Sequence, residues 1–520
     1  MVFLSWQTPV FVSIFIIAFD VYWLLKSIYL SLHLRHTYKV MRAIMAENWL
    51  KRLEIEYALP SVCNHSGHSD EFVYSDCATP SWREMHHLII FPMYKEPLSL
   101  VRDSFLSLCK ANYPLDRFMV VLAIEESAGE EARATAREIE REFADKFYKF
   151  MVTIHPAGLP GEIPGKGSNE SWSAREAKRL IIDPLTKELG LSLKNNSGHS
   201  DESVDSGRFL SYDKILVSVF DVDTQIFPDY FGRLTYVFLN APDRLRAIYQ
   251  PIPLFTNNIY ESPALARVIA FTTSFWQMMQ QSRPARLTTF SSQSVPLPVL
   301  LNIGFWHKDI VSEDSRIFWQ CYLHYHGDFR VEPMFYPVAM DANCAPTFWG
   351  TMKNIYKQQR RWAWGVENTP YLLEGFRKDP LIPARKKWYW SFVDLEGRHS
   401  WATNALMIFA LGWLPVALGG KIFNATLLSY NLTDITRTII NISMAGVGGS
   451  AIFGILLLPE KPTWFKLRHY LLYILQWALI PITLIFFGAF PGLDAQTRLM
   501  LGGKFRLGFW VTPKGRYSKT

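Results

Sequence analysis

The chain has few cysteines and few charged residues for its length. Its 520 residues include five cysteines, Cys63, Cys77, Cys109, Cys321 and Cys344, which are too few and too scattered for a disulfide framework. Charged residues make up 19% of the chain, against roughly 25% in an average soluble protein. With 49% hydrophobic and 15% aromatic residues, the composition excludes intrinsic disorder, collagen and coiled coil. The length predicts two or three structural units.

The excess of positive charge is small. The chain carries 54 lysines and arginines against 47 acidic residues, a net charge of +7. The basic residues cluster beside apolar runs, where they mark the cytoplasmic side of a membrane. The charge therefore predicts contact with membrane lipids, and binding of nucleic acid is not expected.

The first long apolar run begins at Pro9 and reads PVFVSIFIIAFDVYWLLKSIYLSL. It is long enough to cross roughly 30 Å of hydrocarbon. No basic residue precedes it and no small-residue cleavage site follows it, so it is predicted to be a membrane span rather than a cleavable signal peptide. The basic residues from Lys26 to Arg42 place the following part of the chain in the cytosol.

Two features of this region have alternative interpretations. The stretch from His33 to Leu53 mixes basic and apolar residues, which is typical of a helix on the membrane surface or of an ordinary surface helix. Asp20 interrupts the span. It is interpreted either as an acid at a helix contact or polar cavity, or as a residue with a direct role.

Three further apolar runs lie near the carboxyl end: Trp401 to Leu418, Ile439 to Leu458 and Tyr470 to Phe490. Basic residues precede the first and third runs, and the linker between the first two is nearly neutral, which predicts that this linker is outside. Three crossings would place the tail from Gln496 outside, yet that tail has six basic residues and no acid. We therefore expect one run not to be a simple crossing, and Pro481 in the third run indicates a re-entrant hairpin.

The middle of the chain, residues 80 to 375, has the character of a soluble domain. Short apolar runs at His87–Phe91, Phe118–Ile124, Ile215–Phe220 and Arg246–Gln250 alternate with helical stretches such as Glu130–Phe150. This alternation predicts an α/β fold with a mainly parallel sheet. Ligands bind such sheets at the carboxyl ends of the strands, so functional residues are expected just after the strands.

An Asp-x-Asp triplet follows the apolar strand KILVSVF. Asp221 and Asp223 are spaced by one residue at the point where the strand ends. Two acids at this spacing both approach a divalent ion on a diphosphate, because the backbone turns there and the ion offsets their charge. The triplet predicts a Mg²⁺ or Mn²⁺ site, although such triplets are also common by chance.

Other polar groups follow the predicted strands. The first strand runs into the segment FPMYKE, residues 91–96, and the second ends in Glu125 and Glu126. Their alternative interpretation is ordinary loop polarity. The glycine-rich loop from Gly161 to Asn169 contains Lys166, which suits phosphate binding, but the loop lacks the spacing of a P-loop.

Two more motifs lie further along the chain. The triplet from Ser312 to Asp314 leads into the helical run SRIFWQCYLHYHG, where an acid serves as an N-cap or as a general base. The segment QQRRW, residues 358–362, ends a helical stretch. Arg361 and Trp362 are expected there to hold a diphosphate and stack on a sugar, or to anchor the chain at a membrane interface.

In this order, and between membrane spans, the motifs resemble those of the membrane-integrated family 2 glycosyltransferases, such as cellulose synthase and hyaluronan synthase. The resemblance covers residues 85 to 370 and rests on Pro-x-Tyr-x-Glu, Asp-x-Asp, Ser-Glu-Asp and Gln-x-x-Arg-Trp. The tail segment FWVTPK, residues 509–514, is similar to the gating-loop motif of cellulose synthases, which closes over the nucleotide on the cytosolic side. The chain departs from the family where Glu125 and Glu126 replace the usual aspartates and where Ser312 begins the triplet.

The resemblance implies a GT-A-like fold and the inverting transfer of a sugar from a nucleotide sugar, expected to be a UDP-sugar. Asp223 would coordinate Mg²⁺ or Mn²⁺ on the diphosphate, Asp221 would hold the nucleotide and the metal site, and Asp314 would be the general base. The other implied roles are nucleotide-sugar contacts from Pro92, Tyr94, Glu96, Glu125 and Lys166, acceptor or diphosphate contacts from Glu313, Gln358, Arg361 and Trp362, and gating by Phe509, Val511, Thr512 and Lys514.

The acceptor implied by the resemblance is a growing polysaccharide. Transfer of a single sugar to a lipid carrier or glycolipid is the alternative among enzymes, and a catalytically silent membrane scaffold is the alternative of another class. The few predicted membrane spans are a small number from which to build a channel for a polymer. An oligomer or an export partner is therefore expected to complete the channel. The protein is expected to be a multi-pass protein, in the plasma membrane, with its catalytic domain in the cytosol.

The predicted organisation has six parts. They are a membrane segment (1–32), an interfacial linker (33–84), the glycosyltransferase domain (85–375), a second interfacial linker (376–400), a membrane region (401–490) and a basic cytosolic tail (491–520).

One feature lies outside the resemblance. The segment NHSGHSDE at residues 64–71 nearly repeats as NNSGHSDE at 195–202. Because Cys63 and Cys77 flank the first copy, a zinc site is one interpretation, and a pair of polar loops is the other.

Overall fold

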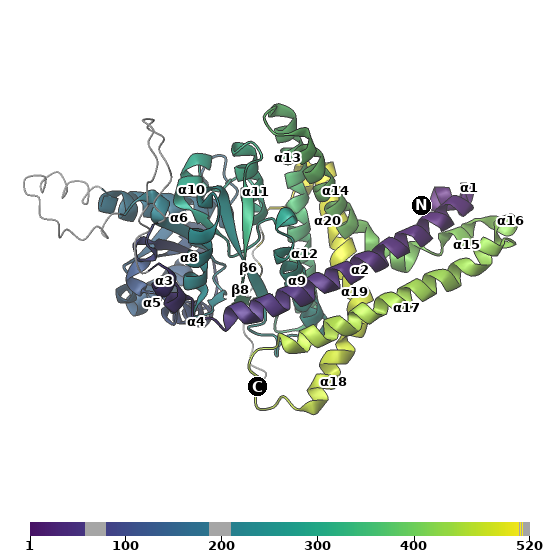
Figure 1. Cartoon of the computed structure of the whole chain (residues 1–520), viewed down its shortest axis with the longest axis horizontal. Helices are drawn as coiled ribbons and strands as arrows, with labels where there is room; N and C mark the ends of the chain where they lie inside the picture. Colours follow the sequence, from purple (N-terminus) through teal and green to yellow (C-terminus); the bar gives the residue numbers. More distant parts are fainter. Residues whose placement is uncertain (58–79, 187–209, 509, 511, 513–520) are drawn as a thin grey trace, which may run out of the picture.

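The computed structural model describes residues 1–57, 80–186, 210–508, 510 and 512 (Figure 1). Within these residues, an eight-stranded mixed β-sheet has the strand order β3-β2-β1-β4-β7-β6-β8-β5. The predicted α/β fold with a mainly parallel sheet is confirmed. The strands are β1 (His86–Met93), β2 (Phe118–Glu125), β3 (Lys149–His155), β4 (Ile215–Val219), β5 (Gln225–Ile226), β6 (Ala247–Phe255), β7 (Ser294–Pro296) and β8 (Arg330–Met340).

Most strands of the sheet point the same way. β1 is parallel to β2 and β4, and β2 is parallel to β3. β7 is antiparallel to both β4 and β6, and β8 is parallel to β6. The strands β1, β2, β3, β4, β6 and β8 therefore end at the same edge of the sheet, which we call the carboxyl edge.

Helices cover both faces of the sheet. In β1, Ile89 and Phe91 pack into one core, and Leu88 and Ile90 pack into the other, because successive side chains of a strand point to opposite faces. Burial on both faces explains why these strands are apolar throughout rather than alternating. The first core includes α4 (Leu98–Cys109), α5 (Glu130–Phe143) and α8 (Tyr230–Asn240), and the second includes α6 (Lys166–Ala177), α10 (Leu297–Ile303) and α11 (Glu313–His324).

The predicted helix Glu130–Phe150 is too long. Helix α5 ends at Phe143, and Lys149–His155 forms the strand β3. The buried face of α5 follows helical spacing through Ala136, Ile139 and Phe143 and stops there. The segment beyond contains Val-Thr-Ile, whose β-branched side chains favour a strand.

Three helices of the described chain are long and apolar enough to cross a membrane: Pro9–Met45, Leu427–Leu456 and Leu467–Leu501. The first two, α2 and α17, lie side by side (Figure 1). The predicted run Trp401–Leu418 is not among them. Helix α14 (Ala384–Leu406) passes into a π-turn and then into the short helix α15 (Leu414–Leu418), which has a proline in its first turn.

The predicted re-entrant hairpin at Pro481 is wrong. Residues Leu467–Leu501 form one continuous helical segment made of α18 (Leu467–Leu475), α19 (Ile480–Leu484), α20 (Phe490–Leu501) and the 3-10 and π turns between them. Pro481 lies in the first turn of α19, where a missing N–H costs little. The segment packs on α9 (Ala264–Gln281) and α12 (Phe348–Ala363) and runs across the direction of α2 and α17 (Figure 1).

The apolar helices are joined to the sheet by a shared core. Leu34 and Met41 of α2 are buried together with Leu254 of β6, Phe271 of α9 and Trp477. The region His33–Leu53 therefore packs on the protein, which favours the ordinary helix over one that lies on a membrane surface.

Candidate active site

A cavity of about 1050 Å³ lies at the carboxyl edge of the sheet and extends to α2, α9, α14 and the segment around Phe487. It brings together the residues that the sequence singled out. Those that line it are Pro92, Tyr94, Glu96, Glu125, Lys166, Asp221, Asp223, Glu313, Asp314, Gln358, Arg361, Trp362 and Thr512.

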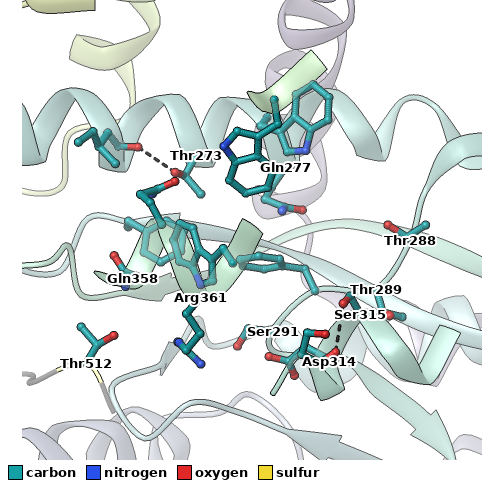
Figure 2. Close-up of a pocket in the computed structure, with 18 of the residues that line it drawn as sticks. Thr273, Gln277, Thr288, Thr289, Ser291, Asp314, Ser315, Gln358, Arg361 and Thr512 are labelled. Carbon is teal, nitrogen blue, oxygen red and sulfur yellow. Dashed lines mark hydrogen bonds between the residues drawn. The ribbon is translucent and has the colours of Figure 1, made fainter. Parts of the chain in front are cut away.

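The tail reaches this cavity at two residues. Thr512 is buried in the wall, on the same side as Gln358 and Arg361 (Figure 2), and its hydroxyl has no hydrogen-bond partner in the described chain. The ammonium of Lys357 lies 5.0 Å from the ring centre of Trp510. The other predicted gating residues, Phe509, Val511 and Lys514, and the two repeated loops at 64–71 and 195–202 lie outside the described residues.

Lys166, in the first turn of α6, lies among four carboxylates. Its Nζ is 2.9 Å from Asp221 Oδ1 and 2.9 Å from Asp314 Oδ2, with Glu170 at 3.4 Å and Glu313 at 3.8 Å. Burial alone would lower the pKa of Lys166, but the carboxylates outweigh it and raise this pKa well above its usual value. The lysine is therefore charged, and it links the Asp-x-Asp triplet to Asp314.

Asp314 faces the cavity from the first turn of α11 (Figure 2). The N-cap of this helix is Ser312, not Asp314, and Ser312 donates from its backbone N–H and hydroxyl to Glu367. The side chain of Asp314 is 25% exposed. Burial raises its pKa, and Lys166 opposes the rise. Asp314 is therefore a stronger base than an ordinary aspartate, at a position that a ligand can reach.

Glu313 and Glu170 are the buried members of the cluster. Burial and Asp314 raise the pKa of Glu313 to about 8, and burial raises the pKa of Glu170 well above its usual value. Oxygens of Glu170, Glu313 and Asp314 lie within 4.8 Å of one another, a spacing that suits a metal ion. Because Lys166 already lies against these carboxylates, we interpret the cluster as the binding place of its ammonium.

Close packing of α6 on α11 depends on a glycine. A Cβ on Gly167 would lie 2.9 Å from Glu313 Cβ and 2.9 Å from the carbonyl oxygen of His307. A Cβ essentially never lies this close to another heavy atom, so a side chain would push the two helices apart. Gly167 therefore allows Lys166 to reach Asp314.

Asp223 follows β4 and is 1% exposed. Its Oδ2 accepts a hydrogen bond of 3.3 Å from the backbone N–H of Asp341, which follows β8 and also lines the cavity. Carboxylate oxygens are the ligands that Mg²⁺ and Mn²⁺ prefer. Asp223 suits such an ion by its chemistry, and Asp341 brings a second carboxyl group to the same cavity. Asp341 was not predicted from the sequence, because Pro333 and Pro337 disfavour a strand in the segment before it.

Helix α12 presents the QQRRW motif. Gln358 and Arg361 are three residues apart, so they share the face that lines the cavity. Arg360 points elsewhere and donates to Asp494 of α20 at 2.8 Å, which holds the apolar helix on the domain. Trp362 packs beside two phenylalanines. Its ring centre lies 6.0 Å from that of Phe255 and 5.9 Å from that of Phe290.

Glu96 shapes the end of β1. One of its carboxylate oxygens accepts a 2.7 Å hydrogen bond from the backbone N–H of Tyr94. This contact holds the turn that brings Tyr94 into the cavity wall, so Glu96 has a local structural role there.

Comparisons by sequence identify no relatives: no family model and no curated protein matches the chain. Among solved structures, the mannosyltransferase PcManGT from Pyrobaculum calidifontis, in complex with GDP-Man and Mn²⁺, is 11% identical, with 82% of this chain and 99% of that chain covered and a TM-score of 0.41. TarS 1–349 from S. aureus is 11% identical over 71% and 90% of the two chains, with a TM-score of 0.32, and its complex with UDP-GlcNAc has a TM-score of 0.29 at 12% identity. Similarities this low do not establish a family or an activity for this chain.

Proposed function

We propose that the protein is a membrane-bound inverting glycosyltransferase that transfers a sugar from a nucleotide sugar to a growing polysaccharide. One observation carries the proposal: a metal-suited acid, Asp223, and a cavity-facing base, Asp314, share one cavity at the carboxyl edge with Arg361. Lys166 bridges Asp221 and Asp314 within it. The sheet domain, residues 85–375 as predicted, would be the catalytic unit.

The donor would lie along the carboxyl edge. Tyr94 follows β1, and Glu125 is the last residue of the neighbouring strand β2. Both would contact the nucleoside of a UDP-sugar. Asp223 and Asp341 would hold Mg²⁺ or Mn²⁺, whose bound charge would offset that of the departing diphosphate. Arg361 would bind diphosphate oxygens, a contact that suits the planar guanidinium.

Asp314 would accept the proton of the acceptor hydroxyl. As that oxygen attacks the anomeric carbon, the bond from this carbon to the diphosphate oxygen breaks, and the electron pair leaves with the diphosphate. Attack from the face opposite the leaving group inverts the anomeric centre. Lys166 would keep Asp314 ionised until the proton arrives, since its charge favours the carboxylate.

The far end of the cavity would receive the acceptor. Trp276 of α9 and Trp401 of α14 also line the cavity, and aromatic faces of this kind pack against the apolar faces of sugar rings. Ile408 and Phe487 line it as well, which favours a second candidate, transfer of one sugar to a lipid-linked acceptor. In either case the protein would span the membrane with this domain in the cytosol.

The test is sugar transfer by membranes that contain the protein, with a panel of radiolabelled nucleotide sugars and Mg²⁺ or Mn²⁺. We expect metal-dependent incorporation that Asp314→Asn lowers by about 10²- to 10⁴-fold. The matched control is Asp116→Asn, an exposed acid that precedes β2 at the opposite edge. A long product indicates a polymer synthase, and a single added sugar indicates the lipid acceptor. No transfer from any donor would support a silent scaffold.

A further inference from the structure

A buried histidine lies between two carboxylates at the end of β3. His155 is 3% exposed. Its Nδ1 is 2.9 Å from Glu125 Oε2, and its Nε2 is 2.9 Å from Glu162 Oε2. Glu162 also accepts a hydrogen bond of 2.6 Å from Lys308. The contacts form a chain that runs from the end of β2 to the segment before Ser312.

The contacts of His155 indicate the charged imidazolium. A neutral imidazole has one N–H and could donate to only one of the two carboxylates. Burial alone would lower the pKa of His155, but Glu125 and Glu162 outweigh it and raise this pKa. Burial would raise the pKa of Glu162, yet Lys308 and His155 hold it below its usual value. The ring of Trp172, 5.8 Å away on α6, adds no charge.

Glu125 has one oxygen left for a ligand. It lines the cavity and is 7% exposed. His155 takes Oε2, whereas Oε1 is buried and has no hydrogen-bond partner in the part of the chain that the structure describes. A buried oxygen without a donor is unfavourable, so a donor from a bound molecule is expected there. In the sheet, β1 lies between β2 and β4. Glu125 is therefore two strands away from Asp223, at the place where the proposed function puts the nucleoside.

The same histidine fixes the loop that leads to Lys166. Residues 156–165 connect β3 to α6. The loop is held by His155 and Lys308 through Glu162, and by the hydrogen bond of 2.8 Å from the backbone N–H of Ile163 to the carbonyl oxygen of Lys308. Movement of His155 would therefore disturb both Glu125 and the approach of Lys166 to Asp314.

We propose that His155 is a positioning residue of the donor site: it fixes Glu125 so that Oε1 accepts an N–H of the nucleotide base, and it fixes the loop before Lys166. This inference rests on the proposed function. It predicts that nucleotide affinity depends on the proton of the imidazolium. Binding is tight below the pKa of His155 and weakens as the pH rises through it, because one of the two hydrogen bonds is then lost.

The test uses the full-length protein, purified in detergent, with UDP and GDP titrated in parallel in the presence of Mg²⁺. Binding is measured by calorimetry over a pH range that brackets the ordinary histidine pKa of about 6.5. His155→Asn and His155→Gln each keep one donor and cannot titrate. We expect about tenfold weaker binding than wild type at the acidic end and convergence with wild type at the alkaline end. Titration of the nucleotide phosphate is common to all proteins and cancels in this comparison.

Kinetics separate positioning from chemistry. At the acidic end of this pH range, the donor KM of the two His155 variants should rise about tenfold while kcat stays close to the wild-type value. Glu162→Gln removes one charge that raises the pKa of His155, so it should move the midpoint of the affinity profile to lower pH. This variant decides the question if the His155 variants fail to fold. His324→Gln, at an exposed position of α11, is the matched control and should bind as wild type does.

The outcomes distinguish the two proposals. Wild-type protein that transfers sugar and binds its nucleotide equally well with and without His155, at every pH, overturns the role of His155 alone. The same holds if the variants lose kcat at an unchanged KM. Wild-type protein that binds neither nucleotide and transfers no sugar overturns the proposed function, and this inference with it.

Discussion

At the scale of single residues, Lys166 connects the two halves of the site. Its ammonium contacts Asp221, which follows β4, and Asp314, which lies in the first turn of α11. A buried charge is stable only when it is paired, so the carboxylates and the lysine depend on one another. Removal of Lys166 would leave Asp314 facing other acids, and both catalysis and folding would suffer.

Lys166→Met tests this dependence. We expect the free energy of unfolding to fall by about 3 kcal/mol at neutral pH, and transfer to be lost. The pKa of Lys166 is raised above 10.5, so in wild type its contribution is complete at neutral pH and is lost only as the pH rises through that raised pKa. In the variant the defect should shrink as the pH falls, because protons neutralise the carboxylates.

The measurement is the thermal unfolding midpoint across pH. Lys178→Met is the control, because Lys178 forms a more exposed pair with Asp183 at 2.8 Å, and pairs of this kind contribute little. An unfolding midpoint of Lys166→Met equal to that of wild type would show that the carboxylates do not need the lysine.

At the scale of elements, much of the site could be predicted from where strands end. The apolar runs before Tyr94, Glu125 and Asp221 identified their strands, and the parallel order of those strands brings these residues to one edge. His155 was missed because β3 has a partly exposed burial pattern and follows α5 closely, and the predicted helix Glu130–Phe150 included the first two residues of this strand. Its partners, Glu125 and Glu162, come from separate segments, and only the folded chain places them against the ring.

The contact of α6 with α11 gives a prediction at this scale. Gly167→Ala places a Cβ 2.9 Å from Glu313 Cβ and from the carbonyl oxygen of His307. We expect destabilisation by about 1–3 kcal/mol and a strong loss of transfer, because the shift separates Lys166 from Asp314. Gly448→Ala in α17 is the control: a Cβ there meets nothing within 4 Å, and alanine is the better helix former. Full activity of Gly167→Ala, assayed beside this control, would contradict the prediction.

At the scale of the whole molecule, apolar helices from both ends of the chain enclose one end of the cavity. The order of apolar runs in the sequence identified α2 and α17, but it could not show that Leu467–Leu501 runs across them on α9 and α12 (Figure 1). Hydropathy measures how apolar a segment is and carries no information about its direction. The direction of the segment is set by tertiary contacts, such as that of Arg360 with Asp494.

An ion pair joins helix α2 to helix α14 beside the cavity. Lys26 of α2 donates to Glu396 of α14 at 2.5 Å, and both side chains are less than one fifth exposed. We expect Lys26→Met to lower the stability by about 1–3 kcal/mol, because Glu396 then keeps a hydrogen bond of 2.9 Å from Ser400 and the more distant cation of Arg286, at 3.7 Å, and loses its close cation. The exchanged pair Lys26→Glu with Glu396→Lys should recover part of the loss. Thermal unfolding of the single and double variants measures the coupling, and a double variant no better than the sum of its parts would refute it.

The distance along the chain between these two partners has a consequence for biosynthesis. Lys26 and Glu396 are 370 residues apart, so at about 5–20 residues per second a ribosome needs roughly 20 to 70 seconds to deliver the acid after the lysine. Under the proposed function, the first helix would lie in the bilayer throughout that interval with its ammonium unpaired, and its flexible side chain can carry that charge toward the lipid headgroups. The ion pair with Glu396 would form only after α14 has been synthesised, and it would then bring α2 against α14. The wall of the cavity that contains Lys26 would therefore be completed only at that stage of translation.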